Sequence, residues 1–127
     1  MVNKKQSRYS NGDEKLKAMR EAAHPDGVSV DPVPVTAGEE VTILYYGHLA
    51  RPDQEEVWLH LGYGPANHWE KVTEMRMERT GRGWVKTFSV GEGDRLNFCF
   101  RDRHGSWDNN GGLNWSLEIH EGRIPGH

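Results

Sequence analysis

The residues of this chain best suited to hold a ligand lie in two glycine-containing stretches. Residues 104–115, HGSWDNNGGLNW, contain two tryptophans, three asparagines and three glycines. Residues 62–69, GYGPANHW, end on a further tryptophan. Glycine and asparagine favour tight turns, and a core does not need a large aromatic ring inside such a turn. Trp69 and Trp107 are therefore candidate contact residues.

The segment before the first of these loops adds a histidine to the set. In 55–63, EEVWLHLGY, aliphatic residues alternate on one face of a strand, so Trp58 and His60 point to the other face. His60, Trp69 and Trp107 thus all lie outside the predicted core pattern. The place of Trp58 stays open, because it could also pack under the N-terminal segment.

These residue types together suit a sugar. A sugar ring has an apolar face of C–H groups and an edge of hydroxyls, and a flat indole covers that face while tolerating partial exposure. An asparagine amide both donates and accepts hydrogen bonds, as a hydroxyl does. Two tryptophans set at an angle would hold a curved glucan, whereas a coplanar row would suit a flat, crystalline one. An ordinary Asn-Gly hairpin turn explains the asparagines and glycines equally well, but it does not explain Trp107.

The scaffold for these residues is predicted to be all-β. Apolar and polar residues alternate in six segments with glycine-rich turns between them, which favours an antiparallel sandwich or barrel. The segments are 39–49, 55–63, 71–79, 82–90, 94–102 and 115–119. The alternation places Trp84 and Trp115 in the core. It puts Cys99 out of phase with Phe98 and Phe100, where we expect a mildly exposed thiol without a role.

Length and composition indicate one domain with short ends. A chain of 127 residues is long enough to bury its own core. We expect an N-terminal extension over 1–30, the β-sandwich over 31–122 and a tail over 123–127. Within the extension, 13–23 (DEKLKAMREAA) predicts a short helix with a thin apolar stripe. So short a helix would be loosely docked or disordered.

Composition argues against several classes of function. The net charge of −3 leaves no basic excess for nucleic acid, and no apolar run approaches the ~20 residues of a membrane helix. The first residues are charged but lack the apolar segment of a signal peptide, so we expect a cytoplasmic protein. The seven histidines show no tight metal-ligand spacing, and no carboxylate pair indicates glycoside hydrolysis. We expect no metal, no cofactor, no catalytic residue and no enzyme activity.

The stretch SWDNNGGLNW resembles the signature of the starch-binding carbohydrate-binding modules of families 25 and 53. Further landmarks follow in the family's order, namely PVTAGEEVTILYYGHL, VWLHLGYGPANHW and GWVKTFSV. The resemblance runs from about Val33 to Ile119 and implies an immunoglobulin-like antiparallel β-sandwich. In such a module, Asp108 of the signature would brace its turn through the carboxylate.

The resemblance also implies a site for α-1,4-linked glucan. These modules use a strand histidine, a tryptophan in the following loop and the tryptophan of the signature. By position these fall on His60, Trp69 and Trp107. Asn109 and Asn110 match the two asparagines of the signature; one or both would bond sugar hydroxyls, while the other would hold the loop.

Two functions from different classes follow. The first is non-catalytic binding of α-glucan (starch, glycogen or maltooligosaccharides) by a module that could serve a glucan-active enzyme. The alternative is an immunoglobulin-like protein–protein interaction module that uses the same exposed aromatic surface. A further idea is that the predicted helix docks on the sandwich and controls access to the shallow groove in which the glucan would bind.

Overall fold

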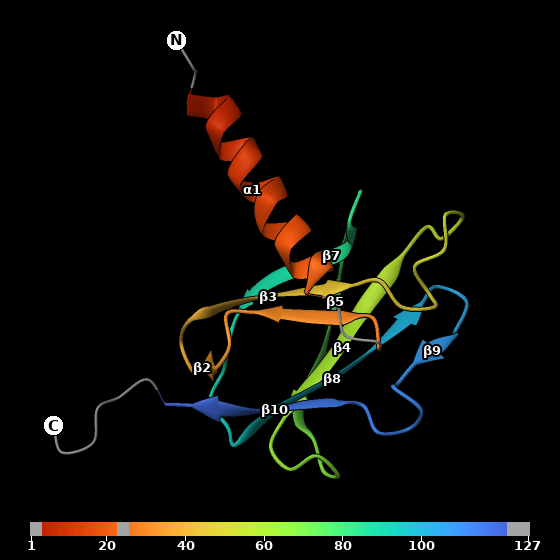
Figure 1. Cartoon of the computed structure of the whole chain (residues 1–127). Helices are drawn as coiled ribbons and strands as arrows, with labels where there is room; N and C mark the ends of the chain where they lie inside the picture. The colour runs from red at the N-terminus through yellow and green to blue at the C-terminus, as the bar shows by residue number, and fades with distance from the viewer. Residues whose placement is uncertain (1–3, 23–25, 122–127) are drawn as a thin grey trace, which may run out of the picture.

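The computed structural model describes residues 4–22 and 26–121 of the chain. The elements are α1 (Lys4–Glu21), β1 (Val28–Asp31), β2 (Val35–Thr36), β3 (Glu40–Tyr45), β4 (Val57–Tyr63), β5 (Glu70–Arg76), β6 (Glu78–Thr80), β7 (Gly83–Ser89), β8 (Arg95–Asp102), β9 (Trp107–Asp108) and β10 (Trp115–His120). A four-stranded sheet has the order β1-β3-β7-β6, and a six-stranded sheet has the order β2-β10-β8-β4-β5 with β9 paired to β8. The sheets pack face to face with α1 outside them (Figure 1). The predicted all-β sandwich is confirmed.

Five of the six predicted segments form single strands, and the sixth is divided. The prediction of one strand over 71–79 is wrong, because β5 ends at Arg76 and β6 begins at Glu78 in the other sheet. Between them, Met77 is buried in the core, and its backbone N–H donates to the Val57 carbonyl at 2.9 Å. The chain crosses here from one sheet to the other. Alternation does not reveal the crossing, because the apolar period of two continues through it.

Two short strands precede the first predicted one. β1 pairs antiparallel with β3, whereas β2 pairs in parallel with β10, the one parallel pairing among the described strands. Because β1 begins at Val28, the sandwich starts before the predicted boundary at residue 31. The run of alternating residues in β1 is only four residues long and prolines follow it, so its signal is weak.

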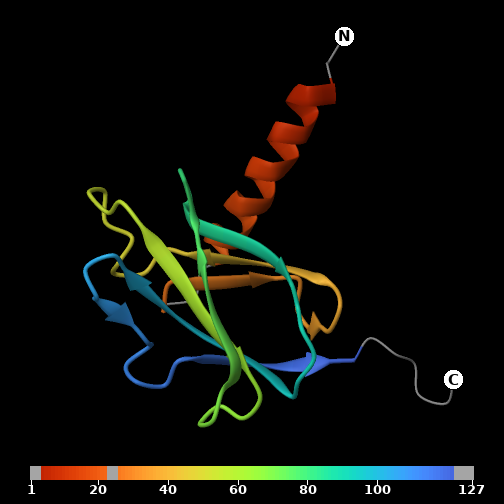
Figure 2. The same cartoon turned by 180° about the vertical axis from the view of Figure 1, so that it is seen from behind.

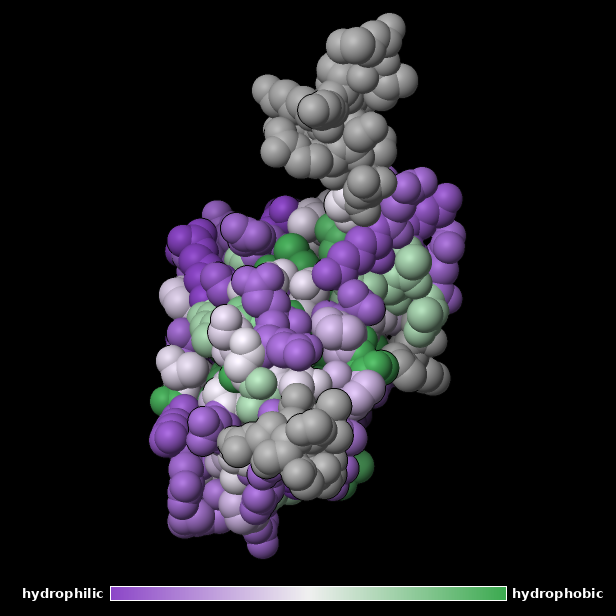
Figure 3. Space-filling model, turned by 90° about the vertical axis from the view of Figure 1, so that its left-hand side faces the viewer, coloured by the Kyte–Doolittle hydropathy of each residue, from purple (hydrophilic) through white to green (hydrophobic). Residues whose placement is uncertain are grey.

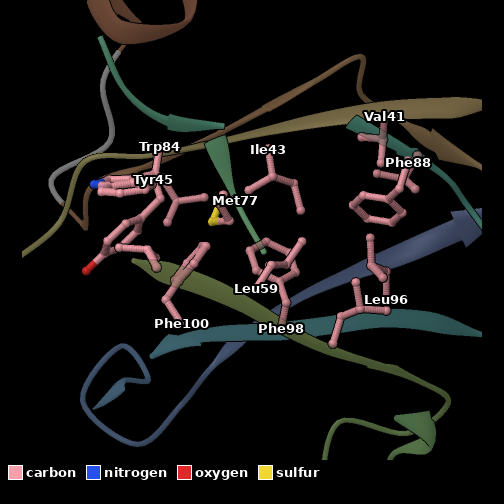
Figure 4. Close-up of a cluster of buried hydrophobic side chains, with 14 of the residues drawn as sticks. Val41, Ile43, Tyr45, Leu59, Met77, Trp84, Phe88, Leu96, Phe98 and Phe100 are labelled. Atoms are coloured by element: carbon pink, nitrogen blue, oxygen red, sulfur yellow. The ribbon is translucent and has the colours of Figure 1, made fainter. Parts of the chain in front are cut away.

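The core lies between the two sheets and is built from the inward positions of both. Figure 4 shows Val41, Ile43, Tyr45, Trp84 and Phe88 of the four-stranded sheet facing Leu59, Leu96, Phe98 and Phe100 of the other, with Met77 among them. Trp84 is buried as predicted, whereas Trp115 is half-buried at the edge of the core, against Phe98 and Phe100. In the view of Figure 3 the surface is mainly hydrophilic, with apolar residues in small separate patches.

The helix α1 lies at the outer face of the four-stranded sheet, where its end contacts β1 and β3 (Figure 2). It begins at Lys4, well before the predicted start at residue 13; Gly12 lowers helix propensity by about 1 kcal/mol but does not interrupt the helix. Met19 is 6% exposed, and its carbonyl accepts a hydrogen bond from Ser29 Oγ at 2.6 Å. Leu44 points away from the core yet is fully buried. The end of α1 is therefore docked.

Within residues 4–22 and 26–121, no helix is both long enough and apolar enough to cross a membrane.

The docking of α1 can be tested at Met19. We expect Met19→Ala to lower the free energy of unfolding by about 2 kcal/mol, because it removes a buried side chain and leaves a cavity. Lys17→Ala, on the exposed side of the same helix, should change stability by less than about 0.5 kcal/mol. Urea unfolding measures both. Equal stability of Met19→Ala and the wild type would mean that the helix is not docked in solution.

Candidate functional site

The three aromatic residues predicted to bind a ligand meet on the outer face of the six-stranded sheet. His60 lies on β4, Trp69 lies directly before β5, and Trp107 begins β9. The His60 ring centroid is 6.0 Å from that of Trp69 and 5.2 Å from that of Trp107. Trp107 is 46% exposed, and His60 and Trp69 are partly exposed. Residues separated by up to 47 positions in the sequence thus form one aromatic surface.

A glycine on β4 makes room for Trp69. A Cβ atom at Gly62 would lie 2.8 Å from Trp69 Cβ and 3.1 Å from its ring carbon Cε3, closer than side chains normally pack. The indole therefore lies directly over the backbone of β4, next to His60. Its Nε1–H donates to the Ala66 carbonyl at 2.8 Å. This hydrogen bond fixes the edge of the ring within its own loop and leaves the ring face as the contact surface.

Trp107 reaches the site from the far side of β8. It is the cross-strand partner of Arg101, while His60 on β4 is the partner of Cys99. Because β8 lies between β9 and β4, the indole must extend over β8 to come within 5.2 Å of His60. Cys99 on this face of β8 is only 5% exposed. The prediction of an exposed thiol is therefore wrong. Burial raises the pKa of Cys99 to about 11.

A carboxylate holds the turn that leads from β8 to β9. Asp102 Oδ1 accepts hydrogen bonds from the backbone N–H groups of His104 and Ser106, both at 2.9 Å. Burial alone would raise the pKa of Asp102. The hydrogen bonds from the backbone and from Gln54 stabilise its charged form more, so its pKa lies below the usual value. The turn before Trp107 is thus fixed by a buried anion.

A second carboxylate ties the turn after Trp107 to the opposite sheet. Tyr45 at the end of β3 donates its hydroxyl to Asp108 Oδ2 at 2.6 Å, and the Leu49 N–H donates to that hydroxyl at 3.0 Å. Asp108 Oδ1 also accepts from the Asn110 N–H at 3.3 Å. Burial and the neighbouring carboxylate both raise the pKa of Tyr45. The predicted bracing role of Asp108 is confirmed.

Glu74 on β5 joins His60 to Arg101. Its Oε2 lies 2.9 Å from His60 Nδ1, and Arg101 donates to both of its carboxylate oxygens, at 2.7 and 2.5 Å. The Arg101 guanidinium, assisted by His60, holds the pKa of Glu74 at about 2. An ionised carboxylate only accepts hydrogen bonds, so His60 Nδ1 carries a proton and donates it. In the neutral imidazole, Nε2 is then a hydrogen-bond acceptor.

The two asparagines of the predicted site belong to the loop and not to the ring cluster. Asn109 Oδ1 accepts from the Gly112 N–H at 3.0 Å, and Asn110 Nδ2 donates to the Asn114 carbonyl at 3.3 Å. Asn110 and Asn114 have positive φ angles of 56° and 59°, a conformation that asparagine tolerates better than most residues. Hydrogen bonding within the turn therefore accounts for both residues, and a sugar contact by either one stays a prediction.

Asn110 also lines a separate recess. This hollow of about 540 Å³ is bounded by residues of α1, of the segment after β3, and of β9 with the loop that follows it, among them Arg20, Tyr46, His48 and Asp108. Neither His60 nor Trp69 nor Trp107 lines it. The loop that carries Trp107 thus has two sides, one toward the ring cluster and one toward the end of α1.

Sequence reasoning missed the network beneath the rings. Trp58 lies on the face of β4 that carries His60, and the Arg101 guanidinium carbon is 5.1 Å from its ring centroid. The alternative that Trp58 packs under the N-terminal segment is wrong, because α1 lies on the other sheet. Glu74 faces His60 across β4 and β5. Alternation alone could have paired Glu74 with His60 only if the register between β4 and β5 were known.

The described residues, 4–22 and 26–121, contain no group of three or more His, Cys, Asp or Glu side chains placed to hold a metal ion.

Comparison with known proteins adds an independent line of evidence. Residues 41–98 match the model of starch/carbohydrate-binding module family 53. The matched stretch includes His60 and Trp69, whereas Trp107 lies just beyond it. An alpha-amylase of Clostridium acetobutylicum is 35% identical over 92 residues, which are 71% of this chain and 11% of the amylase. No solved structure matches the chain.

These matches support a starch-binding carbohydrate-binding module of the family 53 type, and they do not confirm family 25. The chain spans about a tenth of the length of the amylase, since the match covers 11% of that protein. Family 53 is described as a starch/carbohydrate-binding module.

The link between the two sheets can be tested with Tyr45→Phe. We expect a loss of about 2 kcal/mol in the free energy of unfolding, because the buried Asp108 carboxylate loses its phenolic donor. Tyr63→Phe is the comparison. It removes a hydroxyl that accepts one hydrogen bond, from the Gly91 N–H at 2.9 Å, and it leaves no carboxylate without a donor. It should cost about half as much. Equal losses in urea unfolding would contradict a special role for the Tyr45–Asp108 pair.

The lowered pKa of Glu74 predicts a pH dependence of stability. The pKa of Glu74 is lowered from 4.5 to about 2 in the folded protein, so its stabilising effect is complete above pH 4.5 and is lost as the pH falls from 4.5 towards 2. We expect Glu74→Gln to be less stable than the wild type at neutral pH, with a difference that shrinks across this range. Glu70→Gln, an exposed change on the same strand, is the control for urea unfolding at each pH. A difference independent of pH would contradict the assignment.

Proposed function

We propose that this chain binds α-1,4-linked glucan without catalysing its cleavage. The observation that carries the proposal is the convergence of His60, Trp69 and Trp107 on one outer sheet face, in a chain whose residues 41–98 match a starch/carbohydrate-binding module. In this mechanism, glucosyl rings stack on the two indoles, and the polar groups around them bond the hydroxyls.

The relative orientation of the indoles favours a curved ligand. The His60 ring makes an angle of 36° with Trp69 and of 90° with Trp107. Two parallel planes would make equal angles with a third, so the indole planes are not parallel. Rings inclined to each other suit successive sugars of a curved α-linked chain better than the flat surface of a crystalline polysaccharide. This geometry supports glucan of the starch type.

The electrostatics of the site support binding and not hydrolysis. Glycoside hydrolysis requires a carboxylic acid that can protonate the leaving oxygen. Glu74, the carboxylate beside His60, is held ionised by Arg101, which keeps its pKa at about 2. A group with such a low pKa is a poor general acid near neutral pH. We therefore assign Glu74 an orienting role and not that of a general acid.

We also propose that the module serves a glucan-active enzyme. The support is the alpha-amylase of Clostridium acetobutylicum, 11% of which aligns with 71% of this chain at 35% identity. A binding module of modest affinity would keep such an enzyme near its polymer and raise the local substrate concentration. We expect a free energy of binding of roughly −4 to −7 kcal/mol for a short oligosaccharide, which corresponds to dissociation constants of about 1 mM to 10 µM.

Titration with maltoheptaose, followed by tryptophan fluorescence, tests the proposal. We expect a saturable change with maltoheptaose and none with cellohexaose, because only the α-linked chain curves around inclined indoles. Trp107→Ala should lose about 2 kcal/mol of binding free energy, which is about a 30-fold increase in Kd. Leu113→Ala is the matched control, because Leu113 is 79% exposed in the same loop.

Two outcomes would contradict the proposal. If the wild type responds to neither sugar, glucan binding is wrong, and the protein–protein interaction function takes its place. If maltoheptaose binds but Trp107→Ala binds it as tightly as the wild type, the glucan site lies elsewhere on the chain.

A further inference from the structure

A row of four side chains crosses the six-stranded sheet beside the ring cluster. The strand register places Arg76 on β5 opposite Trp58 on β4, Trp58 opposite Arg101 on β8, and Arg101 opposite Trp107 on β9. Cross-strand partners lie on the same side of a sheet, so all four lie on the outer face that carries His60. Arginine and tryptophan alternate along this row, and Arg101 lies between the two tryptophans.

Arg101 is held rigidly in this row. Its Nε and Nη2 donate to the two oxygens of Glu74, and its Nη1 donates to the Asp102 carbonyl at 3.2 Å. The guanidinium carbon lies 5.1 Å from the Trp58 ring centroid. A side chain fixed in this way loses little conformational entropy when it binds a ligand. Arg101 is therefore preorganised, unlike a typical surface arginine.

The guanidinium keeps donors for a ligand. Arginine has five N–H donors, and the three hydrogen bonds described above use three of them. The Arg101 side chain is 25% exposed, so the group is not sealed in the interior. A sugar stacked on Trp107 would have its hydroxyl edge next to Arg101, because the two residues are cross-strand partners.

Glu74 also sets a complementary acceptor at His60, which is close to Trp107. Its Oε2 accepts a hydrogen bond from His60 Nδ1–H, and Nε2 of the neutral imidazole is then an acceptor. One carboxylate thus fixes an acceptor at His60 and donors at Arg101, and Trp107 is close to both. Each neighbouring pair of sugar hydroxyls can accept at one oxygen and donate from the other, which matches this arrangement.

We propose that Arg101 is a further glucan-binding residue, which donates hydrogen bonds to the hydroxyls of the glucosyl unit stacked on Trp107. This inference rests on the proposed glucan function and extends the site beyond His60, Trp69 and Trp107. Glu74 and Trp58 are positioning residues: Glu74 fixes the plane of the guanidinium, and the Trp58 ring packs beside it.

Arg101→Lys separates this proposal from a purely structural role. Lysine keeps the positive charge beside Glu74 but lacks the rigid fork of donors. We expect maltoheptaose affinity to fall about tenfold, which is the effect of losing a charge-assisted hydrogen bond. The proton on His60 Nδ1, followed by ¹⁵N-NMR of the imidazole, should stay in place. Arg101→Ala should weaken binding at least as much.

Arg82→Ala is the matched control. Arg82 also pairs with a carboxylate, Asp13 of α1 at 3.3 Å, but it lies beside the other sheet. This variant should bind maltoheptaose like the wild type. Thermal unfolding of every variant checks that each is folded at the temperature of the titration.

The outcomes distinguish this inference from the function on which it rests. Wild-type affinity of folded Arg101→Lys would overturn the donor role of Arg101, while glucan binding by the wild type would leave the proposed function intact. Weaker binding of Arg101→Lys together with a changed His60 tautomer would also overturn it, because Arg101 would then act through Glu74 alone. Failure of the wild type to bind maltoheptaose would overturn both proposals.

Discussion

The hydrogen bond from the Tyr45 hydroxyl to the Asp108 carboxylate connects the two halves of the sandwich at the site. Tyr45 ends a strand of the four-stranded sheet. Its ring stacks on that of Phe100 of the other sheet, with 4.1 Å between the ring centroids. Its hydroxyl then reaches through the core to the residue after Trp107. The position of the exposed indole is thus determined from inside the protein, because a buried carboxylate without a partner would be costly.

The outer face of the six-stranded sheet can carry a polar network because the inner face supplies the core. Leu59 and Phe100, which alternate with His60 and Arg101, are fully buried in the core. The core between the sheets is therefore formed without the outward residues. The outward residues are therefore free to form charge-assisted hydrogen bonds around Glu74. Such bonds are short and directional, so they fix the orientation of rings and donors. Apolar packing sets where the strands lie, and the network sets the orientation of the groups between them.

Alternation predicts the parts of this structure that depend on one strand at a time. It places Trp84 in the core and His60 on the outer face, since burial of every second residue decides both. It fails where the outcome depends on a neighbouring strand. Cys99 has the predicted phase but is buried on the outer face, and Met77 continues the period while the chain changes sheets. Pairing partners such as Glu74 are properties of register, which local sequence does not contain.

The position of α1 limits how it can act on the site. It packs mainly on β1 and β3, and its Asp13 pairs with Arg82 beside the same sheet, so it lies on the opposite side of the sandwich from the ring cluster and does not cover it. The idea of a helix that closes the groove directly is therefore wrong for this structure. Arg20 at the end of α1 nevertheless lines the same recess as Asp108 and Asn110. At this recess the helix approaches the loop that carries Trp107, and there Asp108 is already fixed by its hydrogen bond from Tyr45.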